Sequence, residues 1–156
     1  MEIRKALPTD VNSITALMRD FAAYEELADY FEATAEDLEE VMFGNNSFVY
    51  GLVGEENGEV VAYTLFYRNY ATFRGQRGLY LEDLYISPDQ RGRGIGEAMI
   101  RKIAQIAKEE GCNRIDFQVL EWNQPAIRFY ERLGAQRDEI ERHFKFTDAA
   151  FDELAR

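Results

Sequence analysis

Three glycines at alternating positions form a turn that could bind phosphate groups. Gly92, Gly94 and Gly96 follow an apolar segment and lead into an amphipathic one. Arg91 before the first glycine and Arg93 after it add positive charge to the turn. Because glycine lacks a side chain, the backbone N–H groups of such a turn can come close to a ligand. A helix that starts here adds about half a positive charge, which favours an anion such as a diphosphate. Taken alone, the motif is also compatible with a glycine-rich turn that binds nothing.

Two common phosphate motifs do not describe this turn. No Lys-Ser or Lys-Thr pair follows the glycines, which excludes a P-loop. The glycines alternate rather than follow the G-x-G-x-x-G pattern, which argues against a dinucleotide-binding fold.

Two further segments carry groups that could take part in acid–base chemistry. Glu82 lies in an otherwise apolar strand, where a carboxylate needs either a partner or a solvated cleft. Asp83 follows it and points to the opposite face if the strand alternates regularly. Tyr130 follows Phe129 in a helical segment, a pair that is equally typical of core packing.

The scarcity of cysteine and histidine excludes several kinds of site. Cys112 and His143 are the only residues of their types, so no internal disulfide can form and a structural zinc site is not expected. A Ser-His or Cys-His catalytic pair would have to use His143, and nothing near it suggests one. A single cysteine favours a reducing compartment, so we expect a cytoplasmic protein without a bound metal.

The acidic residues are concentrated in one part of the chain. The net charge is −11, and the stretch between Arg19 and Arg68 has twelve acidic residues and no Lys, Arg or His. This segment should repel nucleic acid and anionic membranes and attract a cationic ligand. The alternative is a solvated acidic surface that keeps the protein soluble.

The elements that must position these residues alternate in type, so we expect one mixed α/β domain over residues 1–156. No apolar run approaches the roughly 20 residues of a membrane-spanning helix, and no secretory signal is apparent. Asn57-Gly58 predicts a hairpin turn, and Thr34-Ala35-Glu36-Asp37 predicts a capping box. The periodicity predicts strands at 2–6, 47–53, 60–70, 79–86, 114–120, 135–140 and 142–147, and helices at about 10–22, 34–43, 95–110, 125–133 and 148–156.

The pattern Arg91-x-x-Gly94-x-Gly96 after an apolar strand resembles the acyl-CoA signature of the GNAT acetyltransferases, Q/R-x-x-G-x-G/A. Further segments stand in the same order and spacing as in the diamine (spermidine/spermine and thialysine) acetyltransferases of that family. These segments are Tyr24-Glu25, Tyr80-Leu81-Glu82-Asp83, Glu121-Trp122-Asn123-Gln124-Pro125, Phe129-Tyr130 and Gly134-Ala135. The resemblance covers almost the whole chain.

The resemblance implies a GNAT fold, which is a central, mostly antiparallel twisted sheet with a splayed parallel strand pair and flanking helices. It implies acetyl-CoA as cosubstrate, with the pantetheine arm between the splayed strands, and it suggests a homodimer. The residues it implies for coenzyme binding are Leu84, Tyr85, Ile86, Arg91, Gly92, Arg93, Gly94, Ile95, Gly96, Glu97, Asn123, Ala126 and Tyr130.

The same resemblance implies catalytic and acceptor residues. Tyr130 would protonate the leaving sulfur, Glu82 would act as general base through water, and a backbone N–H near Leu84 would polarise the thioester carbonyl. The implied acceptor is the primary amine of a small cationic molecule such as a diamine, a polyamine or a lysine-like amine. The residues implied to bind it are Tyr24, Glu25, Glu82, Asp83, Asp116, Phe117 and Gln118.

Departures from the subfamily leave the exact amine open. The region after Gly134 is about three residues shorter than in the animal enzymes, and an expected aromatic residue is replaced around Glu141. The alternatives are a GNAT enzyme for a protein N-terminus, an amino acid or an aminoglycoside, a non-catalytic acyl-CoA-binding module, and a structural adaptor that uses the acidic face.

Overall fold

The computed structural model describes all residues, 1–156, as two compact units, Met1–Asn123 and Gln124–Arg156. In the first unit the strands are β1 (Glu2–Lys5), β2 (Tyr50–Glu56), β3 (Glu59–Ala71), β4 (Gln76–Ile86) and β5 (Ile115–Phe117). Its helices are α1 (Val11–Tyr24), α2 (Ala35–Phe43) and α3 (Ile95–Glu109), with short 3₁₀ turns at Pro8–Asp10, Ala28–Tyr30 and Pro88–Gln90. The second unit contains α4 (Gln124–Arg132) and α5 (Asp148–Leu154). None of these helices combines the length and the apolar character needed to cross a bilayer.

The five strands form one sheet in the order β1-β2-β3-β4-β5. The first four pair antiparallel, and β5 pairs with β4 in parallel after the crossover through α3. The predicted hairpin turn is confirmed, because Asn57 and Gly58 have φ angles of 54° and 81° between β2 and β3. This mixed architecture, with one parallel pair at the edge of an antiparallel sheet, confirms the predicted fold class.

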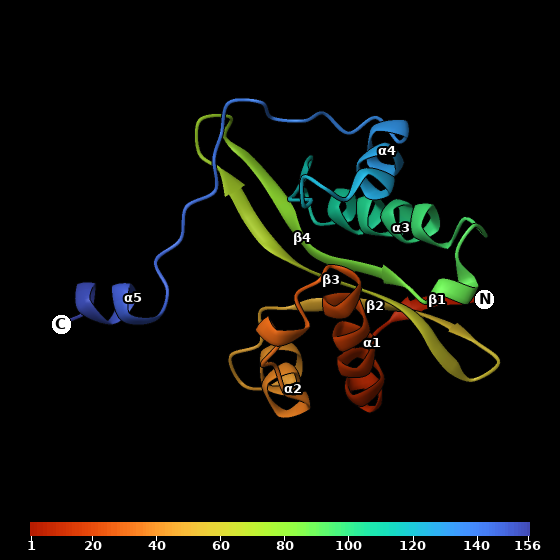
Figure 1. Ribbon diagram of the computed structural model, residues 1–156. Helices are drawn as coiled ribbons and strands as arrows, with labels where there is room; N and C mark the ends of the chain where they lie inside the picture. Colours follow the sequence, from red (N-terminus) through yellow and green to blue (C-terminus); the bar gives the residue numbers. More distant parts are fainter. The chain divides into compact units, whose positions relative to one another are not determined.

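Helices cover both faces of the sheet in the first unit (Figure 1). On one face, α1 and α2 bury Ile14 and Leu38 against side chains of the strands such as Val53, Tyr63 and Leu65. On the other face lies α3, whose Met99 and Ile103 are fully buried. Each fully buried aliphatic side chain of this size stabilises the fold by about 1.5–3 kcal/mol. The core therefore holds the middle of the sheet rigid on both sides.

The start of α2 follows a capping signal in the sequence, whereas the start of α1 does not. Thr34 and Asp37 form the predicted capping box at the start of α2, since each side chain accepts a hydrogen bond from the other residue's backbone N–H. Asp10 precedes α1, but its carboxylate instead accepts bonds from the Leu7 N–H and from Arg4. Asp10 therefore ties the start of α1 to β1.

In the second unit, the two strands predicted at 135–140 and 142–147 are absent. No strand occurs between α4 and α5; Asp138 Oδ1 instead accepts the backbone N–H groups of Ile140 and Glu141. These two N–H groups are therefore bonded within the turn, whereas in a strand they could donate to a neighbouring strand. The alternation of Phe144 and Phe146 satisfies the strand pattern, but these side chains are 88% and 70% exposed.

Candidate active site

The second half of β4 has a free edge because β5 pairs only with its first half. The parallel pairing joins Leu79 to Ile115 and ends where Leu81 meets Phe117. At this point β4 carries a bulge, since Leu65 and Phe66 of β3 face Asp83 and Leu81 and leave Glu82 as the extra residue. A bulge bends a strand and increases its twist. We call the segment Asp83–Ile86, which pairs with β3 alone, the open edge of β4.

The backbone direction along the open edge follows from the ladder with β3. The Ser87 N–H donates to the Val61 carbonyl at 2.9 Å. Every second residue of an antiparallel strand bonds to the partner strand, so Tyr85 bonds to β3 while Leu84 and Ile86 point away from it. The N–H groups of Leu84 and Ile86 are therefore directed to the side where β5 has diverged, as a chain of coenzyme amides would require.

The glycine turn leads into α3 without a side-chain cap. The first helical bond runs from the Ala98 N–H to the Gly94 carbonyl at 3.0 Å, which leaves the N–H groups of Ile95, Gly96 and Glu97 without acceptors in the helix. A Cβ atom added to Gly92 or Gly94 would meet no atom within 4 Å, so the turn is open on its outer side. Uncapped N–H groups at the positive end of a long helix suit a diphosphate.

The two arginines of the turn are held by other parts of the protein. The Arg91 guanidinium lies 4.8 Å from the Tyr24 ring centroid and 5.3 Å from that of Tyr85, and its Nε donates to the Ile86 carbonyl at 2.9 Å. The Arg93 guanidinium makes two bonds of 2.7 Å to the Glu56 carboxylate. Their charges are thus shared with protein groups rather than left free.

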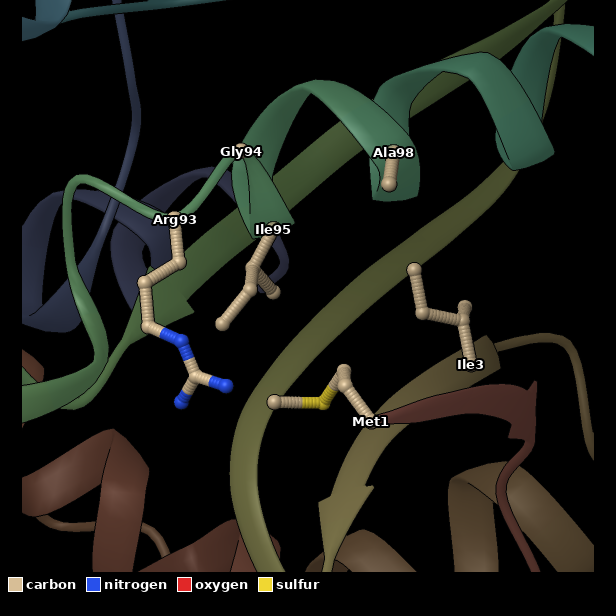
Figure 2. Close-up of a pocket in the computed structure, with 6 residues that line it drawn as sticks. All are labelled: Met1, Ile3, Arg93, Gly94, Ile95 and Ala98. Carbon is tan, nitrogen blue, oxygen red and sulfur yellow. The ribbon is translucent and has the colours of Figure 1, made fainter.

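A cavity of about 260 Å³ lies beside the start of α3, and Figure 2 shows the residues that line it. Arg93, Gly94 and Ile95 of this lining belong to the predicted coenzyme site, whereas the first residues of the chain had no predicted role. The remaining lining residues are Met1, Ile3 and Ala98. Residues at the N-terminus of the chain therefore lie beside the predicted coenzyme turn.

Asp83 is the most perturbed carboxyl group of the site. The pKa of Asp83 is raised to about 6, mainly by burial and in smaller part by the negative charges of Glu82 and Glu25, while the hydrogen bond from Tyr63 opposes the rise. The Tyr63 hydroxyl, whose side chain is fully buried, donates to Asp83 Oδ2 at 2.9 Å. Burial likewise raises the pKa of Glu25 at the end of α1. The site thus contains two carboxyl groups that lack a cation.

Glu82 is exposed at the bulge, in contrast to the more buried Asp83 beside it. The Tyr67 hydroxyl donates to Glu82 Oε2 at 2.9 Å, and the Tyr67 ring stacks on that of Tyr80 with centroids 5.4 Å apart. The carboxylate therefore has a fixed neighbour and access to water. No arginine or lysine pairs with it, so its partner is the Tyr67 hydroxyl and not a cation.

Aromatic rings lie at the end of α1 next to the carboxyl groups. The Tyr24 ring contacts that of Trp122 with centroids 6.2 Å apart, and Arg91 lies over the same tyrosine. Trp122 is 48% exposed, so one part of it can meet a ligand. The structure thus brings the predicted acceptor residues Tyr24, Glu25 and Asp83 into one neighbourhood in the first unit.

The other predicted acceptor residues lie on and after β5. Asp116 pairs with Arg114 through bonds of 2.7 and 2.8 Å, and this guanidinium lowers the pKa of the carboxyl group. Phe117 marks the last pair with β4, and Gln118 follows it. The charge of Asp116 is therefore already balanced, which makes it a weaker candidate for binding an ammonium group than Asp83.

The remaining coenzyme and catalytic candidates follow β5. Asn123 is 5% exposed, and its N–H donates to the Leu120 carbonyl at the end of the first unit. Ala126 and Tyr130 lie on α4 in the second unit, where the rings of Phe129 and Tyr130 meet edge to face at 5.0 Å. The Tyr130 carbonyl accepts the N–H of Ala135 at 3.0 Å, which closes the helix.

Sequence reasoning missed three side chains that fix the site: Tyr63, Tyr67 and Glu56. Each comes from a strand that precedes the motif and contacts it through the sheet or the turn. Tyr63 and Tyr67 were visible only as strand residues, since a hydroxyl partner depends on the register of β3 against β4. The one available signal was that Glu82 and Asp83 needed partners.

Comparisons with known proteins agree with this geometry. Residues 14–135 match the model of the acetyltransferase (GNAT) family. A thialysine N-epsilon-acetyltransferase of Bos taurus is 40% identical over 98% of this chain and 96% of its own, and the spermidine/spermine N(1)-acetyltransferase-like protein 1 of Homo sapiens is 36% identical over 86% of this chain and 20% of its own. An integron cassette protein from V. cholerae shares the fold, with a TM-score of 0.83 at 23% identity over 99% of this chain and 97% of its own. These matches confirm the resemblance: the chain belongs to the GNAT family of acetyltransferases.

Proposed function

We propose that the protein transfers an acetyl group from acetyl-CoA to a primary amine of a small cationic acceptor, such as a diamine, a polyamine or a lysine-like amine. The observation that carries the acceptor class is the pair of carboxyl groups, Glu25 and Asp83, that lies beside Tyr24 and has no cationic partner. An ammonium group placed there would stabilise both ionised carboxylates. One relative is named as an acetyltransferase of thialysine, and the human relative is named as similar to a spermidine/spermine acetyltransferase; these substrates are cationic amines.

The residues of the first unit suit acetyl-CoA. The uncapped N–H groups of Ile95, Gly96 and Glu97 would hold the diphosphate, and the open edge of β4 would pair with the amides of the pantetheine arm. In this arrangement the open side of the glycine turn admits the phosphates without a clash. The coenzyme would supply the acetyl thioester.

Glu82 is the proposed general base. An ammonium group has no lone pair, so the acceptor must lose a proton before it can attack the thioester. Glu82 is exposed to water and fixed by the Tyr67 hydroxyl, which fits a base that works through a water molecule. The N–H of Leu84, which points away from β3, would donate to the thioester oxygen as negative charge develops there.

Tyr130 is the proposed general acid. The departing thiolate has an ordinary pKa near 8.5, so it leaves more readily when a nearby group supplies a proton.

We propose that the two units work together as one acetyltransferase domain, as a homodimer in the cytoplasm. The match of residues 14–135 to a single family supports the joint domain, because it includes both Glu82 and Tyr130.

A coupled assay of acetyl-CoA consumption would test the proposal with amines that differ in the spacing of their charges. The panel comprises putrescine, spermidine, lysine, thialysine, a peptide with a free N-terminus and an aminoglycoside. We expect turnover with the free diamines, polyamines or lysine-like amines and little with the peptide or the aminoglycoside. If those cationic amines all fail to consume acetyl-CoA, the acceptor class is wrong.

The Tyr130→Phe variant tests the general acid. Loss of acid–base assistance should lower kcat by about 10²–10⁴-fold while the affinity for CoA stays nearly unchanged. Tyr70→Phe is a matched control, because Tyr70 is a strand tyrosine that is 60% exposed and has no proposed role. An unchanged kcat in Tyr130→Phe would remove this residue from the mechanism.

A further inference from the structure

Arg93 is tied to the sheet by a two-pronged ion pair with Glu56. Its two terminal nitrogens each donate to a different oxygen of the Glu56 carboxylate at 2.7 Å, and one of them also donates to Gln90. Figure 2 shows the Arg93 side chain leaving the turn and extending toward the side of the cavity where Met1 lies. Glu56 is the last residue of β2, immediately before the Asn57-Gly58 turn. The pair therefore connects the proposed coenzyme turn to a hairpin of the central sheet.

The two residues that flank Arg93 are glycines and have no side chains. Arg93 stands between Gly92 and Gly94, whose φ angles of 77° and 78° lie in the left-handed region. Glycine loses more conformational freedom on folding than any other residue, so such a stretch is flexible unless it is held. Arg93 is the only one of these three residues that has a side chain with which to hold it.

We propose that Glu56 and Arg93 are positioning residues for the coenzyme. The ion pair fixes the backbone of the turn so that the N–H groups of Ile95, Gly96 and Glu97 face the diphosphate. This inference rests on the proposed binding of the coenzyme at this turn. It differs from the expectation drawn from the sequence, in which Arg93 contributed a free positive charge to the phosphate site.

The two roles of Arg93 predict opposite effects for one substitution. If the pair positions the turn, Glu56→Gln releases Arg93 and weakens coenzyme binding. If Arg93 instead attracts the phosphates directly, Glu56→Gln removes a competing negative charge and strengthens coenzyme binding. Arg93→Gln weakens binding in both cases, so Glu56 is the informative position.

The experiment measures the dissociation constant of CoA by isothermal titration calorimetry, and the KM for acetyl-CoA and kcat at saturating amine. The variants are Glu56→Gln, Arg93→Gln, the double variant, and the reversed pair Glu56→Arg with Arg93→Glu. Glu59→Gln and Lys102→Gln are matched controls, because each removes one exposed charge from β3 or α3 without breaking an ion pair. Thermal unfolding of each variant accompanies the binding data.

We expect Glu56→Gln and Arg93→Gln each to raise the dissociation constant and the KM by about three- to tenfold, as for loss of an exposed two-pronged pair. The double variant should match Glu56→Gln, the reversed pair should recover part of the loss, and kcat at saturating acetyl-CoA should stay within about twofold. Unchanged or tighter binding in Glu56→Gln, with CoA bound by the wild type, would overturn the positioning role alone. A wild-type protein that does not bind CoA would overturn the proposed function and this inference together.

Discussion

Replacing Asp83 by asparagine should stabilise the fold while it impairs the enzyme. The folded-state pKa of Asp83 is about 6, above the ordinary value of 3.8, because burial disfavours the ionised form. Below pH 3.8 the group is protonated in both the folded and the unfolded state, so it does not change the free energy of unfolding. Above pH 6 it is ionised in both states, and the buried charge then lowers the free energy of unfolding by its full amount.

The size of the effect follows from the gap between these two pKa values. At about 1.4 kcal/mol per pH unit, the buried carboxylate lowers the free energy of unfolding by about 3 kcal/mol at pH 8 and by about half as much at pH 5. Asparagine has nearly the same shape as aspartate, and its side-chain oxygen can still accept the hydrogen bond from the Tyr63 hydroxyl. Asp83→Asn should therefore raise the free energy of unfolding by up to about 3 kcal/mol at pH 8 and by clearly less at pH 5.

Urea denaturation followed by circular dichroism at pH 5 and pH 8 measures the difference between the variant and the wild type. Asp20→Asn is the control, because it removes an exposed carboxylate of α1 that makes no ion pair. In the acetylation assay, Asp83→Asn should raise the KM for a diamine while the KM for acetyl-CoA stays constant. A variant that is less stable at pH 8, or a stability difference that is equal at both pH values, would refute the electrostatic reasoning.

The remaining predictions concern Tyr63 and the glycine turn. Tyr63→Phe removes the hydrogen bond that lowers the pKa of Asp83, so the acidic limb of the pH profile of kcat/KM for the amine should move to higher pH; an unmoved limb would separate Asp83 from acceptor binding. Gly94→Ala forces a residue with a Cβ to adopt φ of 78°, which should lower the free energy of unfolding by about 1 kcal/mol and raise the KM for acetyl-CoA. Equal stability and KM in that variant would mean that the turn can relax without harm to the site.

The sequence predicted the elements that depend on local signals. The Asn57-Gly58 hairpin and the Thr34 capping box were predicted from neighbouring residues alone, and both are present. The sheet and the glycine turn before α3 also agree with the expectation. The boundaries differ where pairing decides them: β2 begins at Tyr50 rather than at residue 47, and β5 ends at Phe117 rather than at residue 120.

Features that depend on pairing partners could not be predicted in this way. The bulge at Glu82 exists only in the register of β4 against β3, which no local pattern specifies. The Glu56–Arg93 pair joins residues that are 37 positions apart. The two C-terminal strands were predicted from alternation alone, but alternation does not supply the partner strand that a backbone needs, and the turn at Asp138 takes up its donors instead.

The distribution of charge explains how a chain with a net charge of −11 could bind a coenzyme that is itself an anion. Charges separated by more than the Debye length of about 8 Å are largely screened in physiological salt, so only nearby groups decide the outcome. Two acidic side chains near the turn, Glu56 and Glu97, pair with Arg93 and Arg101, and the proposed phosphate ligands are backbone N–H groups. At the acceptor end, Glu25 and Asp83 stay without a cationic partner, so their negative charge is available to an amine. Arg93→Gln should thus weaken coenzyme binding in two ways, because it loosens the turn and leaves the Glu56 carboxylate unpaired beside the phosphates. Glu56→Gln loosens the turn but leaves no unpaired carboxylate there. This asymmetry predicts that Arg93→Gln weakens CoA binding more than Glu56→Gln does, and equal losses would limit the role of the pair to holding the turn.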